Sequence, residues 1–385
     1  MLRRFTGPLA DEIAILCRPQ DGSQTTGTQA DAAYRALATA LAAERASFRD
    51  LAGETLFLRD IRHELPPLLA ARTRVLAELG QADCAPQPAF IQQPPVDGAA
   101  FTLAAAAVLP RDRGAWSVRD VAPQPSCSCE GCVRSAARLV RLGDQVSLHT
   151  ANLHGSGGDA YQQACDMFRA AERLLERCGM QFRDVVRTWI QLRDIDRDYD
   201  ALNTARREFF QHGGIELRPA STGVQGIPFS DAHDCTLSLQ AVQSPHHYVT
   251  GMSTPSLNEA WSYGADFSRG LRVVEANKIT LHVSGTSSID EAGRTVHVGG
   301  FAAQAERMLD NIESLLARQG ASFANLVSGV TYLKRPGDAP VLHALYRRRG
   351  FAGFPCAIVE AGLCRPELLC ETEAVAMLPP LTPGA

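Results

Sequence analysis

The chain has 385 residues, 45% of them hydrophobic and 21% charged, which is the composition of a globular protein with room for two or three domains. Its formal net charge of −4 and the lack of a basic stripe argue against nucleic acid or an anionic membrane surface as a partner. Neither a signal peptide nor an apolar stretch of about 18 residues is expected. The eleven cysteines are therefore expected to be reduced thiols in the cytoplasm.

A pattern of fifteen residues occurs three times along the chain. Its copies lie at 47–61, 181–195 and 322–336. Each copy has a phenylalanine at its second position and alternating apolar residues after it. Such alternation is typical of a β-strand with one buried face. The sequence is therefore predicted to contain three diverged copies of one small unit.

The same series of elements is predicted around each copy of the pattern, with helices indicated by apolar residues at i, i+3 and i+4 spacing. The first unit is predicted to have strands at 13–17 and 99–109 and helices around 34–41 and 64–78. The second is predicted to have strands at 145–150 and 234–243 and helices around 168–178 and 196–212. The third is predicted to have strands at 279–285 and 367–377 and helices around 305–316 and 337–349.

Both helices of a unit are expected on one face of its sheet, so the other face needs a cover that one copy alone cannot supply. Three copies in one chain can place their sheets around a common centre. The predicted fold is α+β, with three tandem units. The expected boundaries are a first unit at 1–112, a cysteine-containing connector at 113–142, a second unit at 143–244, a connector at 245–278 and a third unit at 279–385.

The end of the third unit, residues 355–376, carries a family likeness. Its Glu371-Thr-Glu373-Ala ending resembles the YjgF/RidA superfamily, whose members have a chorismate-mutase-like fold and form trimers with clefts between subunits. The resemblance implies that this chain is a covalent pseudo-trimer of YjgF/RidA-like units. The likeness is weakest in the first unit, which is expected to be a degenerate scaffold because its closing strand at 99–109 is apolar and offers no carboxylate.

The chain departs from the deaminases of this superfamily at one position. Those enzymes hold the substrate carboxylate with an arginine near the start of the closing segment. The matching residues here are Cys356 in the third copy, Ser221-Thr222 in the second and Phe90 in the first. The resemblance therefore disfavours the usual deaminase reaction.

A narrower likeness connects residues 187–243 and 267–377 with the chorismatases. It implies that Glu371 is the catalytic acid, and that Gly285 and Cys364 match the members that make 3-hydroxybenzoate. The chain departs from this family at 261–266, where an expected arginine is missing. The matching pieces are Arg187-Thr-Trp189, Arg206, 219–223, 267–269, 284–286, Gln304, 309–311 and 368–371.

Glu371 and Glu373 are two residues apart on a predicted strand, so their side chains share one face. A carboxyl group in an apolar cleft has a raised pKa and can act as a general acid. The role of acid is assigned to Glu371, and Glu373 is placed among the substrate-binding residues. The alternative is that both are solvated carboxylates on an exposed strand.

Arg269 and Arg206 are candidates to hold a substrate carboxylate by two hydrogen bonds each. Gly285 and Tyr263 are counted with them as substrate-binding residues. For Arg206 the alternative is an exposed, charged helix face. Cys364 precedes the closing strand and can assist proton transfer if its thiol is activated, or it can simply be a small buried residue.

Cys127, Cys129 and Cys132 form a Cys-x-Cys-x-x-Cys cluster outside the repeats. Three thiols this close can bind zinc or another soft metal, with His149, His154 or Cys165 as a fourth ligand. Chance clustering or an oxidisable surface loop is the alternative, because no second cluster accompanies the first. No organic cofactor is expected.

The resulting hypothesis is a chorismatase-like enzyme that acts on chorismate or a related small carboxylated enol ether. It would release pyruvate and a hydroxybenzoate or a dihydroxycyclohexadiene carboxylate, as a monomer or a weak homo-oligomer. One alternative is imine or enamine hydrolysis without the usual arginine. The other is a non-catalytic protein that binds a small metabolite of a biosynthetic pathway.

Overall fold

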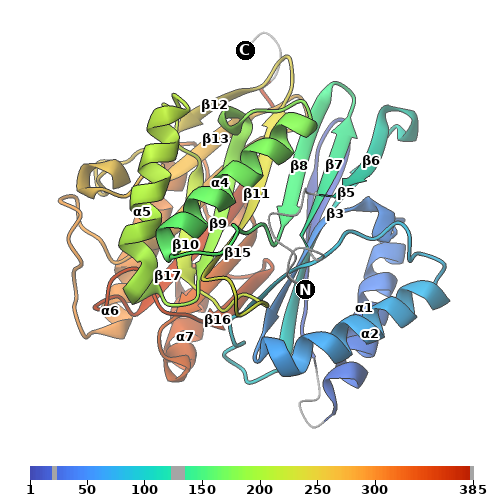
Figure 1. Cartoon of the computed structure of the whole chain (residues 1–385), viewed down its shortest axis with the longest axis horizontal. Helices are drawn as coiled ribbons and strands as arrows, with labels where there is room; N and C mark the ends of the chain where they lie inside the picture. Colours follow the sequence, from blue (N-terminus) through green and yellow to red (C-terminus); the bar gives the residue numbers. More distant parts are fainter. Residues whose placement is uncertain (20–23, 123–134, 382–385) are drawn as a thin grey trace.

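The computed structural model describes residues 1–19, 24–122 and 135–381. These residues form three mixed β-sheets, each with two long helices on one face (Figure 1). The predicted α+β fold with three similar units is therefore confirmed. Among the described residues, no helix is long and apolar enough to span a bilayer.

The first unit has a five-stranded sheet in the order β1-β2-β5-β3-β4, in which only β4 runs parallel to its neighbour. The helices α1 and α2 pack against each other and against this sheet. Its elements are β1 (Leu2–Thr6), β2 (Ala10–Cys17), α1 (Thr26–Ala43), η1 (Phe48–Asp50), β3 (Leu51–Leu58), α2 (Ile61–Glu78), β4 (Ala89–Gln92), β5 (Phe101–Pro110) and η2 (Arg113–Ala115).

The second unit repeats this arrangement with one additional edge strand, in the order β10-β9-β11-β8-β7-β6. The helix pair is now α4 and α5. Its elements are β6 (Trp116–Val121), β7 (Ala136–Leu142), β8 (Gln145–Ala151), α4 (Ala160–Arg177), η3 (Phe182–Asp184), β9 (Val185–Leu192), α5 (Ile195–His212), β10 (Ala220–Gln225) and β11 (Cys235–Gln243).

The third unit has the order β12-β13-β14-β17-β15-β16 and the helix pair α6 and α7. Its elements are β12 (Tyr248–Gly251), η4 (Ala260–Tyr263), β13 (Gly270–Val274), β14 (Ile279–Ser287), α6 (Phe301–Ala317), η5 (Phe323–Asn325), β15 (Leu326–Leu333), η6 (Pro336–Asp338), α7 (Ala339–Arg349), β16 (Cys356–Glu360) and β17 (Cys370–Leu378).

The two segments expected as connectors also contribute structure. Residues 113–142 contain β6 and β7, and residues 245–278 contain β12 and β13. These strands extend the second and third sheets at one edge. Their pairing supplies partners for backbone groups that would otherwise lie at an open sheet edge.

The same turn precedes β3, β9 and β15, which explains why the fifteen-residue pattern could be recognised in the sequence. In each copy the phenylalanine opens a short 3₁₀ helix, and an Asp or Asn two residues later closes a capping box with the residue before it. The phenylalanine side chain is buried in the core, at 1% exposure for Phe48, 4% for Phe182 and 7% for Phe323. The pattern therefore combines a cap with a core anchor.

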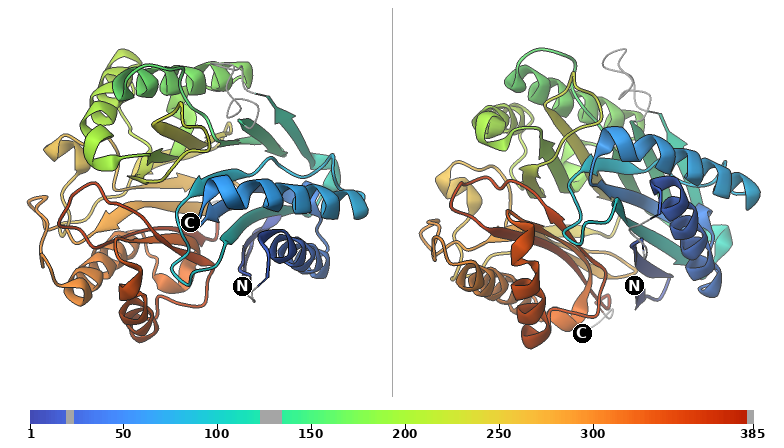
Figure 2. Two further views of the ribbon diagram at one scale, coloured as in Figure 1. Left: turned by 60° about the horizontal axis from the view of Figure 1, so that its bottom comes forward. Right: turned by 90° about the horizontal axis from the view of Figure 1, so that it is seen from below.

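The three sheets are joined to one another in a ring, with the helix pairs on the outside (Figure 2). Isolated backbone bridges connect the units pairwise: Gln92 with Ile227, Pro95 with Val359, and Ala220 with Ser268. The inner faces of the sheets therefore cover one another, as the expectation of a common centre requires.

Replacing Phe182 with alanine is expected to destabilise the second unit by about 3–5 kcal/mol, because a buried ring is lost and a cavity remains. The Phe182 ring lies 6.2 Å from that of Phe168, 4.9 Å from Phe209 and 5.7 Å from Phe210. The midpoint of urea denaturation measures the effect. The exposed neighbour provides the control, since Arg183→Ala should change stability by less than about 0.5 kcal/mol. Equal midpoints for both variants would contradict this account of the anchor.

Candidate functional site

A cleft of about 450 Å³ lies between the second and third units. We call it the inter-unit cleft. The second unit contributes residues of α5 and β10, and the third contributes β14, the start of β17 and the segments before β13 and β17. Five residues predicted from the sequence line it together: Arg206, Arg269, Gly285, Cys364 and Glu371.

Glu371 lies near the start of β17 with its side chain in this cleft and only 5% of the residue exposed. Burial raises the pKa of this carboxyl from 4.5 to about 7, and the negative charge of Glu373 acts in the same direction. A hydrogen bond of 3.1 Å donated by the Ser287 hydroxyl opposes the shift. A carboxyl with a pKa near 7 can hold a proton at neutral pH and give it up to a substrate.

Gly285 leaves the space that the Glu371 carboxyl occupies. A Cβ atom at position 285 would overlap Glu371 Oε1 and approach Thr222 Cγ2 to 3.2 Å. The Gly285 N–H donates to Thr222 Oγ1 at 3.0 Å, so this strand is also fixed to the second unit. The need for glycine at this position is therefore steric.

Arg206 from α5 and Arg269 from the segment before β13 bring two cations into the inter-unit cleft. Each residue is 3% exposed, and each guanidinium lies 5.7 Å from the ring centre of Phe267, which also lines the cleft. Arg206 donates to Asn203 Oδ1 at 2.6 Å, and Arg269 donates to the Asn258 carbonyl at 2.7 Å. These neutral contacts and the aromatic ring orient both guanidinium groups.

Cys364 lies in the segment before β17 and lines the cleft beside Glu371. Burial, together with the charge of Glu371, raises the pKa of its thiol to about 12. The thiol of Cys364 is therefore not activated, as a role in proton transfer would require. At neutral pH this residue is a protonated thiol that packs against the hydrophobic core.

Glu373 lies outside the inter-unit cleft, although it shares a strand face with Glu371. Its carboxylate accepts from Arg187 Nη2 and from Trp189 Nε1, each at 2.7 Å. Arg187 is 1% exposed and its guanidinium lies 4.9 Å from the Trp189 ring centre. This buried ion pair joins β9 of the second unit to β17 of the third. The sequence showed the alternation of these residues but not their partner in another unit.

Two further predicted sites have no described side chains. Tyr263 is the last residue of η4, and its side chain is not among the parts that the structure describes. Cys127, Cys129 and Cys132 lie within 123–134, which is also outside the described residues. Within the described part of the chain, no group of three or more His, Cys, Asp or Glu residues could hold a metal ion.

The pairing register shows how the three units differ at the position of Glu371. Cys370 pairs with Leu333, and the equivalent pairs are Cys235 with Leu192 and Phe101 with Leu58. The residues that follow, Thr102 in the first unit and Thr236 in the second, are therefore the counterparts of Glu371. Neither counterpart is a carboxylate, so the acid occurs at one of three equivalent positions.

The register also corrects one detail of the sequence alignment. Cys356 pairs with Gly329 in the third unit. In the second unit, Ser221 pairs with Thr188, which is the counterpart of Gly329. Phe90 pairs with Leu56, which is two residues beyond the counterpart of Gly329. The matching position in the first unit is therefore Pro88, and it too carries no guanidinium.

Several cleft residues were not predicted from the sequence. Five of them come from α5, where the side chains that face the third unit look like an ordinary polar helix face in the sequence. The spacing of Tyr199, Asn203 and Arg206 at i, i+4 and i+7 gives them one common face, but the sequence does not show what this face meets. The additional lining residues are Tyr199, Asp200, Asn203, Thr204, Arg207, Ser221, Gly223, Gly264, Ala265, Phe267, Ser287, Ile289, Arg365 and Leu368.

Comparison with known proteins agrees with this architecture. Residues 264–378 match the family model described as Endoribonuclease L-PSP. The third unit is therefore similar to the YjgF/RidA (L-PSP) family. The 2-iminobutanoate/2-iminopropanoate deaminase of Bos taurus is 29% identical over 104 residues, 27% of this chain and 76% of that protein. Protein DfrA of Myxococcus xanthus is 34% identical over 84 residues, 22% of this chain and 63% of its own length.

The whole chain also shares its fold with a solved structure described as a chorismatase. The match covers 96% of this chain and 99% of the other, with a TM-score of 0.62 and 17% sequence identity. At this identity the likeness shows the fold. The shared fold extends over nearly the full length of both chains.

The raised pKa of Glu371 predicts a pH dependence of stability. Between pH 4.5 and about 7 the folded chain keeps a proton that the unfolded chain has lost. The stability from this neutral carboxyl is therefore fully present below pH 4.5 and is lost as the pH rises through 7. Thermal midpoints at pH 5 and pH 8 should differ less in Glu371→Gln than in the natural protein.

The matched control is Glu367→Gln, because Glu367 is an exposed carboxylate four residues away. This variant should retain the pH dependence of the natural protein. If Glu371→Gln and Glu367→Gln respond to pH in the same way, the carboxyl of Glu371 is not protonated in the folded chain at neutral pH.

Proposed function

We propose that this chain is a chorismatase-like enzyme that acts on a small carboxylated enol ether, with chorismate as the first candidate. The observation that carries the proposal is the buried carboxyl of Glu371, whose pKa of about 7 occurs in a cleft that also contains Arg206 and Arg269. A proton donor and carboxylate-binding cations in one cleft are what such a reaction requires.

The proposed reaction begins with protonation of the enol ether. Protonated Glu371 delivers its proton to the terminal methylene carbon, whose double-bond electrons form the new C–H bond. The ether carbon becomes an oxocarbenium ion, and the Glu371 carboxylate is left beside it. Addition of water gives a hemiketal that collapses to pyruvate and a ring alcohol. Attack by a hydroxyl of the substrate itself is the alternative second step.

The charge of the inter-unit cleft suits a substrate with two carboxylates. Its lining contains two acidic residues, Asp200 and Glu371, of which Glu371 is protonated in the reactive form. Arg207 is partly neutralised by Asp266, to which it donates at 3.1 Å. The remaining positive charge favours a dianionic ligand. The cationic lining residues are Arg206, Arg207, Arg269 and Arg365.

Imine or enamine hydrolysis is the second candidate, because a relative named 2-iminobutanoate/2-iminopropanoate deaminase is 29% identical to part of the chain. The residues at the position of the deaminase arginine, Cys356, Ser221 and Pro88, offer no guanidinium in any unit. Ammonia release from 2-iminobutanoate tests this candidate directly. A non-catalytic metabolite-binding protein would bind chorismate without turnover.

Incubation with chorismate is expected to release pyruvate and a hydroxybenzoate or a dihydroxycyclohexadiene carboxylate, identified by chromatography. Glu371→Gln should lower the rate roughly 10²–10⁴-fold, because the amide keeps the shape of the side chain but has no acidic proton to transfer. Glu367→Gln is the control and should retain full activity. Unchanged turnover in Glu371→Gln, or no turnover of chorismate by the natural protein, would remove the chorismatase-like proposal.

Gly285→Ala is expected to reduce turnover by displacing the carboxyl of Glu371, since the added methyl group would overlap Oε1. We expect a fall in kcat of about tenfold or more with a smaller change in KM, measured as pyruvate release. The control is Gly337→Ala, because no atom lies within 4 Å of a Cβ at that glycine and its φ is not left-handed. Equal rates for both variants would show that Glu371 needs no space at position 285.

A further inference from the structure

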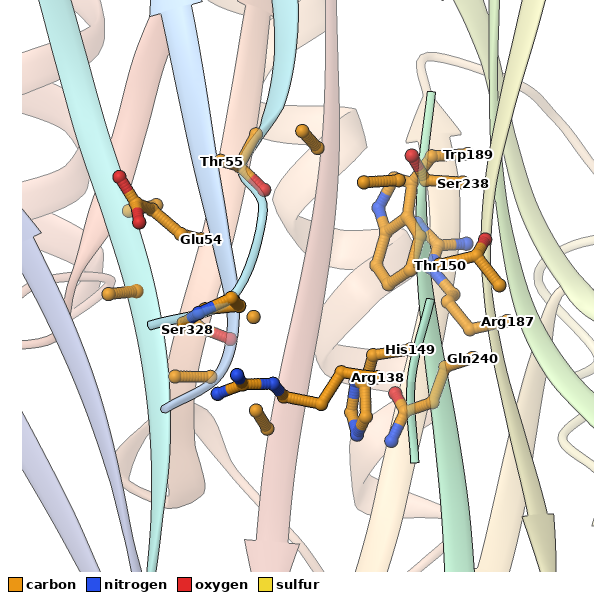
Figure 3. Close-up of a pocket in the computed structure, with 18 of the residues that line it drawn as sticks. Glu54, Thr55, Arg138, His149, Thr150, Arg187, Trp189, Ser238, Gln240 and Ser328 are labelled. Atoms are coloured by element: carbon orange, nitrogen blue, oxygen red, sulfur yellow. The ribbon is translucent and has the colours of Figure 1, made fainter. Parts of the chain in front are cut away.

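A second and larger cavity lies where the inner faces of the three sheets meet (Figure 3). We call it the central cavity. Its volume is about 720 Å³, and none of its lining residues also lines the inter-unit cleft. Figure 3 shows Arg187 and Trp189 of the second unit across the cavity from Thr55 of the first. The proposed function makes no use of this space.

Equivalent positions around the central cavity carry side chains of unequal size in the three units. The strand pairings show that Ala14 in β2, His149 in β8 and His282 in β14 occupy equivalent positions in the three units. Beside them, Ala106 is the counterpart of Gln240. At these positions the first unit lines the cavity with alanine, whereas the second has His149 and Gln240 and the third has His282 and Val375.

Two buried nitrogen atoms of residues that line this cavity lack a hydrogen-bond partner among the described residues. Arg187 is 1% exposed and its Nη1 atom makes no hydrogen bond there, while Nη2 binds Thr222 and Glu373. His282 is 3% exposed, and its Nδ1 atom is likewise unsatisfied. Neither nitrogen is exposed to the open space of the cavity, so these two atoms do not select the ligand.

Most charged residues around the central cavity are paired within the chain, and acidic side chains outnumber basic ones in its lining. Arg187 is paired with Glu373 at 2.7 Å, and Arg138 with Asp120 at 2.7 Å. Lys278 forms an ion pair with Glu12 and lies 3.7 Å from Glu275. Burial and nearby cations lower the pKa of His282 to about 3, which keeps this imidazole neutral. A buried anionic ligand would therefore add an uncompensated charge, which costs several kcal/mol.

We propose that the central cavity is a binding site for an uncharged, flat and largely apolar molecule. The alanine-rich wall of the first unit and the side chain of Trp189 provide the apolar contacts. The cavity volume is within the range of small-molecule sites, roughly 300–1,000 Å³. Exposed lining residues mark a route from solvent: Ala82, Asp83 and Gln87.

The probe for this site is prodan, an uncharged naphthalene ketone whose emission shifts to the blue in apolar surroundings. The full-length chain is expected to bind one prodan molecule with a blue-shifted, saturable signal. Ala106→Phe should weaken binding about tenfold or more, because the new ring occupies the cavity. Ala14→Phe tests the same space independently, in case one filled variant folds poorly by circular dichroism. Ala42→Phe places the same ring on the exposed face of α1 and should bind prodan normally.

Two comparisons separate this site from the inter-unit cleft. Glu371→Gln and saturating chorismate should leave prodan binding unchanged, so the two proposals can fail separately. The anionic analogue 2-naphthoate should bind more weakly than prodan. Absence of saturable prodan binding, tighter binding of 2-naphthoate, or full binding by folded Ala106→Phe and Ala14→Phe would overturn the proposal and leave the cavity as a space filled with water.

Discussion

Each sheet of this protein carries helices on one face only, so its other face must be covered by the neighbouring units. That constraint explains the ring of three sheets, because a single unit would expose the strand face that bears Arg187 and Trp189. It also explains where chemistry can occur. The inter-unit cleft lies where two units meet, and the central cavity lies where all three inner faces converge.

Divergence among the units has given equivalent positions different roles. Glu371 is a buried carboxyl with a raised pKa, while its counterparts Thr102 and Thr236 carry hydroxyl groups. The ion pair between Arg187 and Glu373 fixes the second unit against the third beside that carboxyl. The first unit provides small side chains to the central cavity and no acid at the equivalent position. The three units therefore share a backbone arrangement, but one of them carries an acidic side chain at this position.

The sequence was sufficient for elements whose signal is local. The phenylalanine of each fifteen-residue pattern is both a core anchor and part of a capped turn, so strand and turn could be predicted together. Features that depend on contacts between units could not be predicted in this way. Side-chain alternation placed Glu371 and Glu373 on one face, but not one in the cleft and the other against Arg187. The edge strands β7 and β13 were missed because their segments adjoin runs rich in Pro, Gly and Ser.

The covalent linkage of the units has a consequence for how the cleft responds to dilution. In a trimer of separate subunits, an interface holds only while the protein concentration exceeds the dissociation constant. Here β10 and β14 belong to one chain, and linkage makes their association intramolecular at a fixed effective concentration. The geometry around Glu371 is therefore independent of how much of the protein is present.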